Sequence, residues 1–167
     1  MTRSMKFAIA FASIGLCYCQ SNRGELELFG FEEDSYELEY SKSVFAGFGE
    51  GYSFEIYILS DSLVQSIIAS PQNNLPAKSN SQDLFISYGW NTWPIGSQYD
   101  EVLDISLNYY TRNEGLKKAI NSAKAMIAND SPLVAFYAYP NLPNPKIVQL
   151  FVLDTISRRM YFVDSRL

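Results

Sequence analysis

Three apolar segments close the chain, and each is separated from the next by a short polar turn. They run over Leu133–Tyr139, Lys146–Thr155 and Met160–Asp164. Connections this short join antiparallel neighbours, because a parallel pair of strands needs a crossover of a dozen or more residues. The segments therefore predict an antiparallel meander. The middle one is apolar at both odd and even positions, which indicates a strand deep in a sheet with a helix over it.

Apolar and polar residues alternate with period two in the first half of the chain, which predicts further strands. Glu25–Phe29 and Tyr36–Tyr40 each place glutamates on one face, and Tyr52–Leu59 is typical of a central strand. The glycines within Gly47–Gly51 favour a hairpin or bulge, since they lack the spacing of a phosphate-binding loop. Leu103–Tyr109 also alternates and is predicted as a strand, the alternative being a helix that Ser97 caps.

Two segments show helical periodicity. Glu114–Ala128 places its apolar residues on one face after a capping Asn113, and a shorter helix follows Ser60 and ends at Pro71. The predicted fold is therefore α+β: a largely antiparallel sheet, built from N-terminal strands and the C-terminal meander, with one long and one short amphipathic helix packed on it.

The N-terminus has the pattern of an export signal. Arg3 and Lys6 precede the apolar run Phe7–Leu16, whose length of about ten residues suits a signal peptide and is too short to span a bilayer. Cleavage before Gln20 gives a soluble protein. Lipidation of Cys19 gives a lipoprotein, although the residues before it depart from the usual motif. We expect residues 1–19 to be the signal, 20–24 a polar lead-in and 25–167 one domain.

The chain lacks the side chains on which much catalytic chemistry depends. It has no histidine, and its two cysteines, Cys17 and Cys19, both lie in the predicted signal. Imidazole bases, Ser-His and Cys-His pairs, and histidine-containing metal sites are excluded, so the composition leans against an enzyme and predicts neither cofactor nor metal.

The formal net charge of −5 also narrows the class of partner. Binding to nucleic acid needs a basic face that neutralises phosphates, so we expect no nucleic-acid partner. We expect contact with a membrane only through a lipid anchor at Cys19.

One segment is densely aromatic and is followed by acids. It supplies the candidate contact residues for a ligand or partner, which are Tyr88, Trp90, Trp93, Tyr99, Asp100 and Glu101. If exposed, the rings could stack on sugars or anchor a protein interface; if buried, they are ordinary core packing. Carboxylates near the rings could act as a glycosidase pair, although their spacing selects no pair.

These features together predict an exported bacterial binding protein located in the periplasm or lipid-anchored in the cell envelope. The leading interpretation is an inhibitor or immunity-type module that contacts another envelope protein. The alternatives are a carbohydrate-binding module or carboxylate-dependent glycan hydrolase that uses the Trp/Tyr segment, and a structural envelope protein without a ligand.

Overall fold

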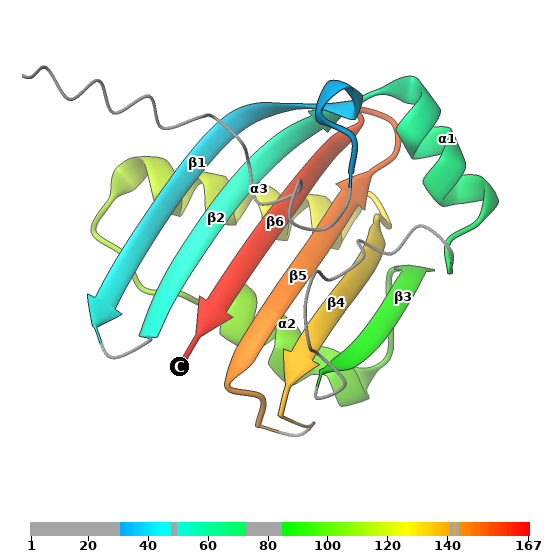
Figure 1. Ribbon diagram of the computed structural model, residues 1–167. Coiled ribbons are helices and arrows are strands. Elements are labelled where there is room, and N and C mark those ends of the chain that lie inside the picture. The colour runs from blue at the N-terminus through cyan, green and yellow to red at the C-terminus, as the bar shows by residue number, and fades with distance from the viewer. Residues whose placement is uncertain (1–30, 48–49, 73–84, 141, 143) are drawn as a thin grey trace, which may run out of the picture.

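A computed structural model describes residues 31–47, 50–72, 85–140, 142 and 144–167. The described part is a mixed α+β fold with a six-stranded antiparallel sheet and three α-helices (Figure 1). The predicted signal, Cys19, the lead-in and the predicted strand Glu25–Phe29 lie outside the described residues.

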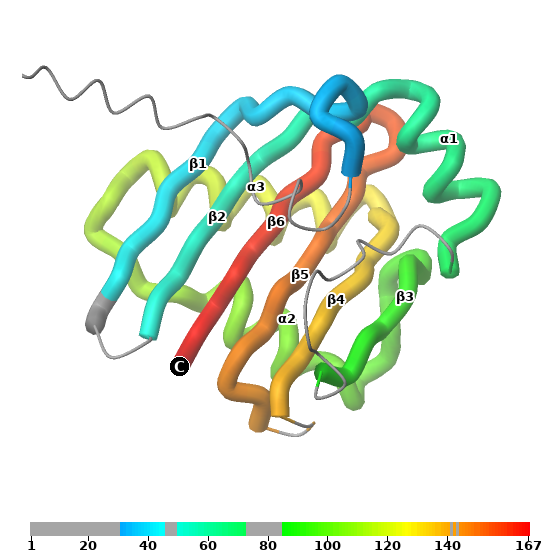
Figure 2. Tube along the Cα trace, viewed as in Figure 1, coloured from blue at the N-terminus to red at the C-terminus, as the bar shows by residue number. Residues whose placement is uncertain are grey.

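The sheet has the strand order β1-β2-β6-β5-β4-β3, and every neighbouring pair is antiparallel. The predicted meander is confirmed as β4, β5 and β6. Figure 2 shows that β6, the last strand, lies inside the sheet between β2 and β5. The strands are β1 (Tyr36–Gly47), β2 (Glu50–Leu59), β3 (Ile86–Thr92), β4 (Leu133–Tyr139), β5 (Ile147–Asp154) and β6 (Arg159–Arg166).

Helices α1 (Asp61–Ala69) and α3 (Glu114–Asn129) begin at the predicted caps. The Ser60 hydroxyl accepts a hydrogen bond from the Leu63 amide, and the Asn113 side chain accepts one from the Leu116 amide. Each bond satisfies an amide that the first helical turn leaves without a backbone partner.

The segment that alternates over Leu103–Tyr109 is not a strand. It forms most of a third helix, α2 (Asp100–Leu107), which follows a single 3-10 turn at Ser97–Tyr99. If this segment were a strand, Val102 would point to the same side as the polar residues Asp104 and Ser106. In the helix, Val102 is buried together with Ser106 and Leu107. Burial of Val102 therefore explains why the helical alternative prevails.

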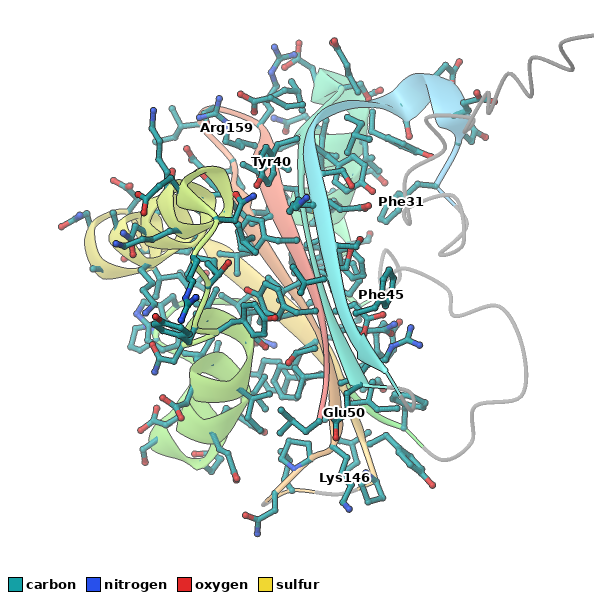
Figure 3. The ribbon with its side chains drawn as sticks, turned by 90° about the vertical axis from the view of Figure 1, so that its left-hand side faces the viewer. Phe31, Tyr40, Phe45, Glu50, Lys146 and Arg159 are labelled. Carbon is teal, nitrogen blue, oxygen red and sulfur yellow. The ribbon has the colours of Figure 1, made fainter. Side chains whose placement is uncertain are left out.

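Two hydrophobic cores lie on opposite faces of the sheet. The larger, which we call the helix-side core, lies between the sheet and helices α2 and α3, and includes Phe54, Phe136 and Leu150. The smaller, which we call the α1-side core, includes Tyr57, Phe151 and Phe162. Figure 3 shows Tyr40 on the side of the sheet that carries α2 and α3, and Phe45 on the opposite side.

Candidate functional site

Two adjoining hollows lie between α3 on one side and α2 with the following residues 108–112 on the other, and we call them together the groove between α2 and α3. The first, the Trp93 hollow, has a volume of about 430 Å³. The second, the Arg112 hollow, has a volume of about 410 Å³. Leu107, Asn108 and Lys124 line both hollows, so the two hollows adjoin at these residues. Its α3 wall runs from Glu114 to Ala128, which corresponds to ~21 Å of helix.

The chain around Trp93 is fixed on both sides. The Trp93 amide donates a hydrogen bond of 2.9 Å to the carbonyl of Pro132, which directly precedes β4. Two residues further on, Ile95 is only 7% exposed in the helix-side core. These anchors hold the chain between β3 and α2, and the half-buried Trp93 side chain lines the hollow.

The Trp93 hollow combines an apolar interior with a rim that is acidic along α2 and carries Lys124 on α3. Leu103, Leu107 and Ile127 contribute apolar surface, and the exposed acids Asp100 and Asp104 lie one turn apart on α2. A ligand with an apolar side chain and a neighbouring cationic group matches this hollow. The apolar side chain would be buried in the interior, and the cation would lie near the two carboxylates.

A polar bridge crosses the junction of the two hollows. The Lys124 ammonium donates a hydrogen bond of 2.5 Å to the Asn108 side-chain oxygen. The Asn108 amide nitrogen in turn donates to the Asp104 carboxylate. The bridge links α3 to α2 and holds the Lys124 charge where both hollows meet.

Cations dominate the Arg112 hollow. Arg112, Lys117 and Lys124 line it, against one acid, Glu114. Elsewhere in the described part, Arg158, Arg159 and Arg166 form ion pairs with carboxylates, whereas Lys42, Lys118 and Lys146 form none with a described carboxylate. Among the described residues, no carboxylate forms an ion pair with any of the three cations of this hollow. A protein of net charge −5 thus gathers an excess of positive charge in this hollow.

The structure separates the six predicted contact residues. Tyr88 and Tyr99 pack together on Phe136, with ring centroids of Tyr88 and Phe136 5.0 Å apart and those of Tyr99 and Phe136 5.3 Å apart. Both tyrosines are partly buried and pack against the helix-side core. Burial, with a smaller contribution from Tyr99, raises the pKa of Tyr88.

Trp90 lies on the other face of the sheet. The pairing of β3 with β4 is irregular between Tyr88 and Asn91, and this bulge reverses the alternation of side chains. Trp90 is consequently 2% exposed in the α1-side core, with its ring 6.2 Å from that of Phe151. A stacking platform formed by Trp90 and Trp93 together does not exist.

The two predicted acids have different surroundings. Asp100 shares the Trp93 hollow with Trp93. Glu101 faces the turn between β4 and β5, where its carboxylate accepts a hydrogen bond of 2.8 Å from the Asn144 amide. The structure therefore brings two of the six residues, Trp93 and Asp100, to one groove.

The cationic lining of the groove was not among the predicted site residues. Lys117, Asn121, Lys124 and Ala128 are spaced by four, three and four residues, so they follow one stripe of α3. This spacing is the signal that sequence reasoning could have used. Nothing in the sequence pattern places Arg112 or Asn108 beside that stripe.

Two buried carboxylates lie on the sheet face opposite the groove. Glu55 accepts hydrogen bonds from the hydroxyls of Tyr57 and Ser41, and Asp164 accepts from the Arg166 guanidinium. Both acids are at most 6% exposed. Hydrogen-bonded partners offset the cost of burying a carboxylate, so we interpret both acids as structural residues of the fold.

No protein-family model, curated protein or solved structure matches this chain. The described helices include none with the length and apolar character needed to cross a bilayer. Within the described ranges, no three His, Cys, Asp or Glu side chains cluster as metal ligands.

Proposed function

We propose that this protein is an exported binding module of the inhibitor or immunity type, which holds a segment of a partner protein in the groove between α2 and α3. One observation carries the proposal: a half-buried indole, an apolar interior and charged rims occur together in one open groove. The sequence pattern of residues 1–19 supports a location in the periplasm, or at the envelope membrane through Cys19.

The groove has the composition that protein interfaces use for their central contacts. Tryptophan is enriched among residues that dominate binding energy, and such residues occupy desolvated pockets surrounded by polar groups. Trp93, with Leu103 and Ile127 beside it, provides the apolar centre, and Asp100 belongs to the polar rim. A partner side chain buried here would contribute affinity, and the rims would select its charge.

A glycan is the second candidate ligand. The specific observation in its favour is that Trp93 lies beside Asp100 and Asp104, because sugars stack on indole rings and hydrogen-bond to carboxylates. Burial of Trp90 leaves Trp93 as the ring that lines the Trp93 hollow, while Tyr109 and Tyr110 line the adjoining Arg112 hollow. A glycan array that returns ligands dependent on Trp93 would favour this candidate over a protein partner.

Site-specific photo-crosslinking in cells tests the proposal. Ala128 lines the Trp93 hollow, whereas Ala125, three residues earlier on α3, is also exposed and does not line either hollow. A photo-reactive residue at position 128 should give one discrete protein adduct that the same residue at position 125 does not give.

The crosslinked partner then allows a quantitative test with purified proteins. Trp93→Ala should weaken its binding by about thirtyfold, the loss typical of a dominant interface residue. Phe45→Ala is the matched control, because Phe45 is an exposed aromatic on the opposite side of the sheet. Equal affinities of the Trp93→Ala variant and the native protein would reject the groove as the contact surface.

A further inference from the structure

The charges along the groove are distributed unevenly, and this distribution restricts what the groove can hold. At the Trp93 end the charged rim of α2 is acidic, with Asp100 and Asp104. At the other end Arg112, Lys117 and Lys124 outnumber Glu114. An occupant that spans both hollows meets a negative rim at one end and a positive rim at the other.

We propose that the partner segment places an apolar side chain in the Trp93 hollow and a carboxylate in the Arg112 hollow. This inference rests on the proposed function and adds the chemistry of the segment and the direction in which its charges run. The gathering of three cations in one hollow carries the argument, since Arg112, Lys117 and Lys124 line it against a single acid, Glu114, and none of the three forms an ion pair with a described carboxylate.

The fold also sets the spacing between the two groups. The Trp93 hollow is lined by α3 residues 124–128, and the Arg112 hollow by α3 residues 114–124. The centres of these stretches are about seven residues apart, which corresponds to ~10 Å along the helix. An extended chain covers that distance in about three residues, so the apolar residue and the acid should be about three positions apart.

Lys117 is the cation on which a test can best rest. It lines the Arg112 hollow only, whereas Lys124 also lines the Trp93 hollow and takes part in the polar bridge. Its neighbour Lys118 is also exposed on the same helix and lines neither hollow. Lys117→Glu and Lys118→Glu change the net charge by the same amount. A difference between the two variants therefore reports where the charge lies and not the total charge of the protein.

A phage library that displays random twelve-residue peptides is the probe, panned on the full chain. We expect the selected peptides to share an apolar residue and an Asp or Glu about three positions from it. Binding of a selected peptide, measured by isothermal titration calorimetry, should weaken about three- to tenfold with Lys117→Glu and should be unchanged with Lys118→Glu. The weakening should diminish at 0.5 M salt, because exposed charge pairs are screened there.

Two other outcomes are decisive in different ways. Peptides that depend on Trp93 but have no acidic position, and that bind the Lys117→Glu variant normally, would overturn this inference and leave the proposed function in place. If no selected peptide depends on Trp93, the groove is not a site for a protein segment, and both proposals fail.

Discussion

Trp90 and Trp93 are three residues apart in the chain and pack into different cores on opposite faces of the sheet. Trp90 is 2% exposed in the α1-side core. Trp93 is half-buried against the helix-side core and lines the groove. The bulge between Tyr88 and Asn91 puts Trp90 on the face opposite Tyr88, although the two are only two positions apart. Trp93 follows the end of β3 at Thr92 and returns to the helix side.

The two indoles should differ in their access to a solvent quencher. In a Trp93→Phe variant the remaining Trp90 should emit at shorter wavelength and resist acrylamide, whereas in a Trp90→Phe variant the remaining Trp93 should be quenched readily. Trp90→Ala should also lower the free energy of unfolding by about 3–5 kcal/mol, the usual cost of truncating a buried large aromatic. Equal quenching constants in the two phenylalanine variants would contradict the placement of Trp90.

Tyr52 should make the protein sensitive to alkaline pH. It is 1% exposed, and its hydroxyl donates a hydrogen bond of 2.7 Å to the Ser106 carbonyl near the end of α2. Burial, followed by the charge of Tyr109, raises its pKa well above the usual value of about 10. Above that usual value the unfolded chain releases the tyrosine proton and the folded protein retains it, so stability falls as pH rises, by up to ~1.4 kcal/mol per pH unit.

Urea denaturation at pH 7, 9, 10 and 11 checks this expectation. Tyr52→Phe should cost about 1–2 kcal/mol at pH 7, because the Ser106 carbonyl loses its buried donor. The same variant should lose less stability than the native protein between pH 9 and 11. Burial also raises the pKa of Tyr40, Tyr88 and Tyr137, so part of the alkaline loss should remain in the variant. Identical pH slopes for the two proteins would show that Tyr52 is not the dominant group.

Asn113 should stabilise the start of α3, which forms one wall of the groove. Its side chain accepts a hydrogen bond of 2.9 Å from the Leu116 amide. Asn113→Ala should lower the free energy of unfolding by about 1 kcal/mol and speed hydrogen exchange in the first turn of α3, whereas Asn113→Asp should preserve both. Ser60→Ala is the control, since Ser60 caps α1 instead, with a bond of 3.3 Å. Unchanged exchange at Leu116 in the alanine variant would contradict the cap.

The sequence contained the local information for most of the elements. Period two in Tyr52–Leu59 and the apolar C-terminal segments specified strands, and Ser60 and Asn113 marked the helices that follow them. These signals are local, because strand alternation and capping depend on residues within a few positions of one another. The exception was α2, where Leu103 and Leu107 fit both periods and only the burial of Val102 decides between them.

The sequence by itself also determined the −5 charge, the absence of histidine and a set of six candidate contacts that included Trp93 and Asp100. Only the tertiary structure decided which of the candidates share a surface. A one-residue bulge sends Trp90 to the opposite core, and the packing of α2 beside α3 brings Asp104, Asn108 and Lys124 together across a groove. The physical reason is that the register and packing between elements decide to which face of the sheet a side chain points. No local sequence pattern encodes them.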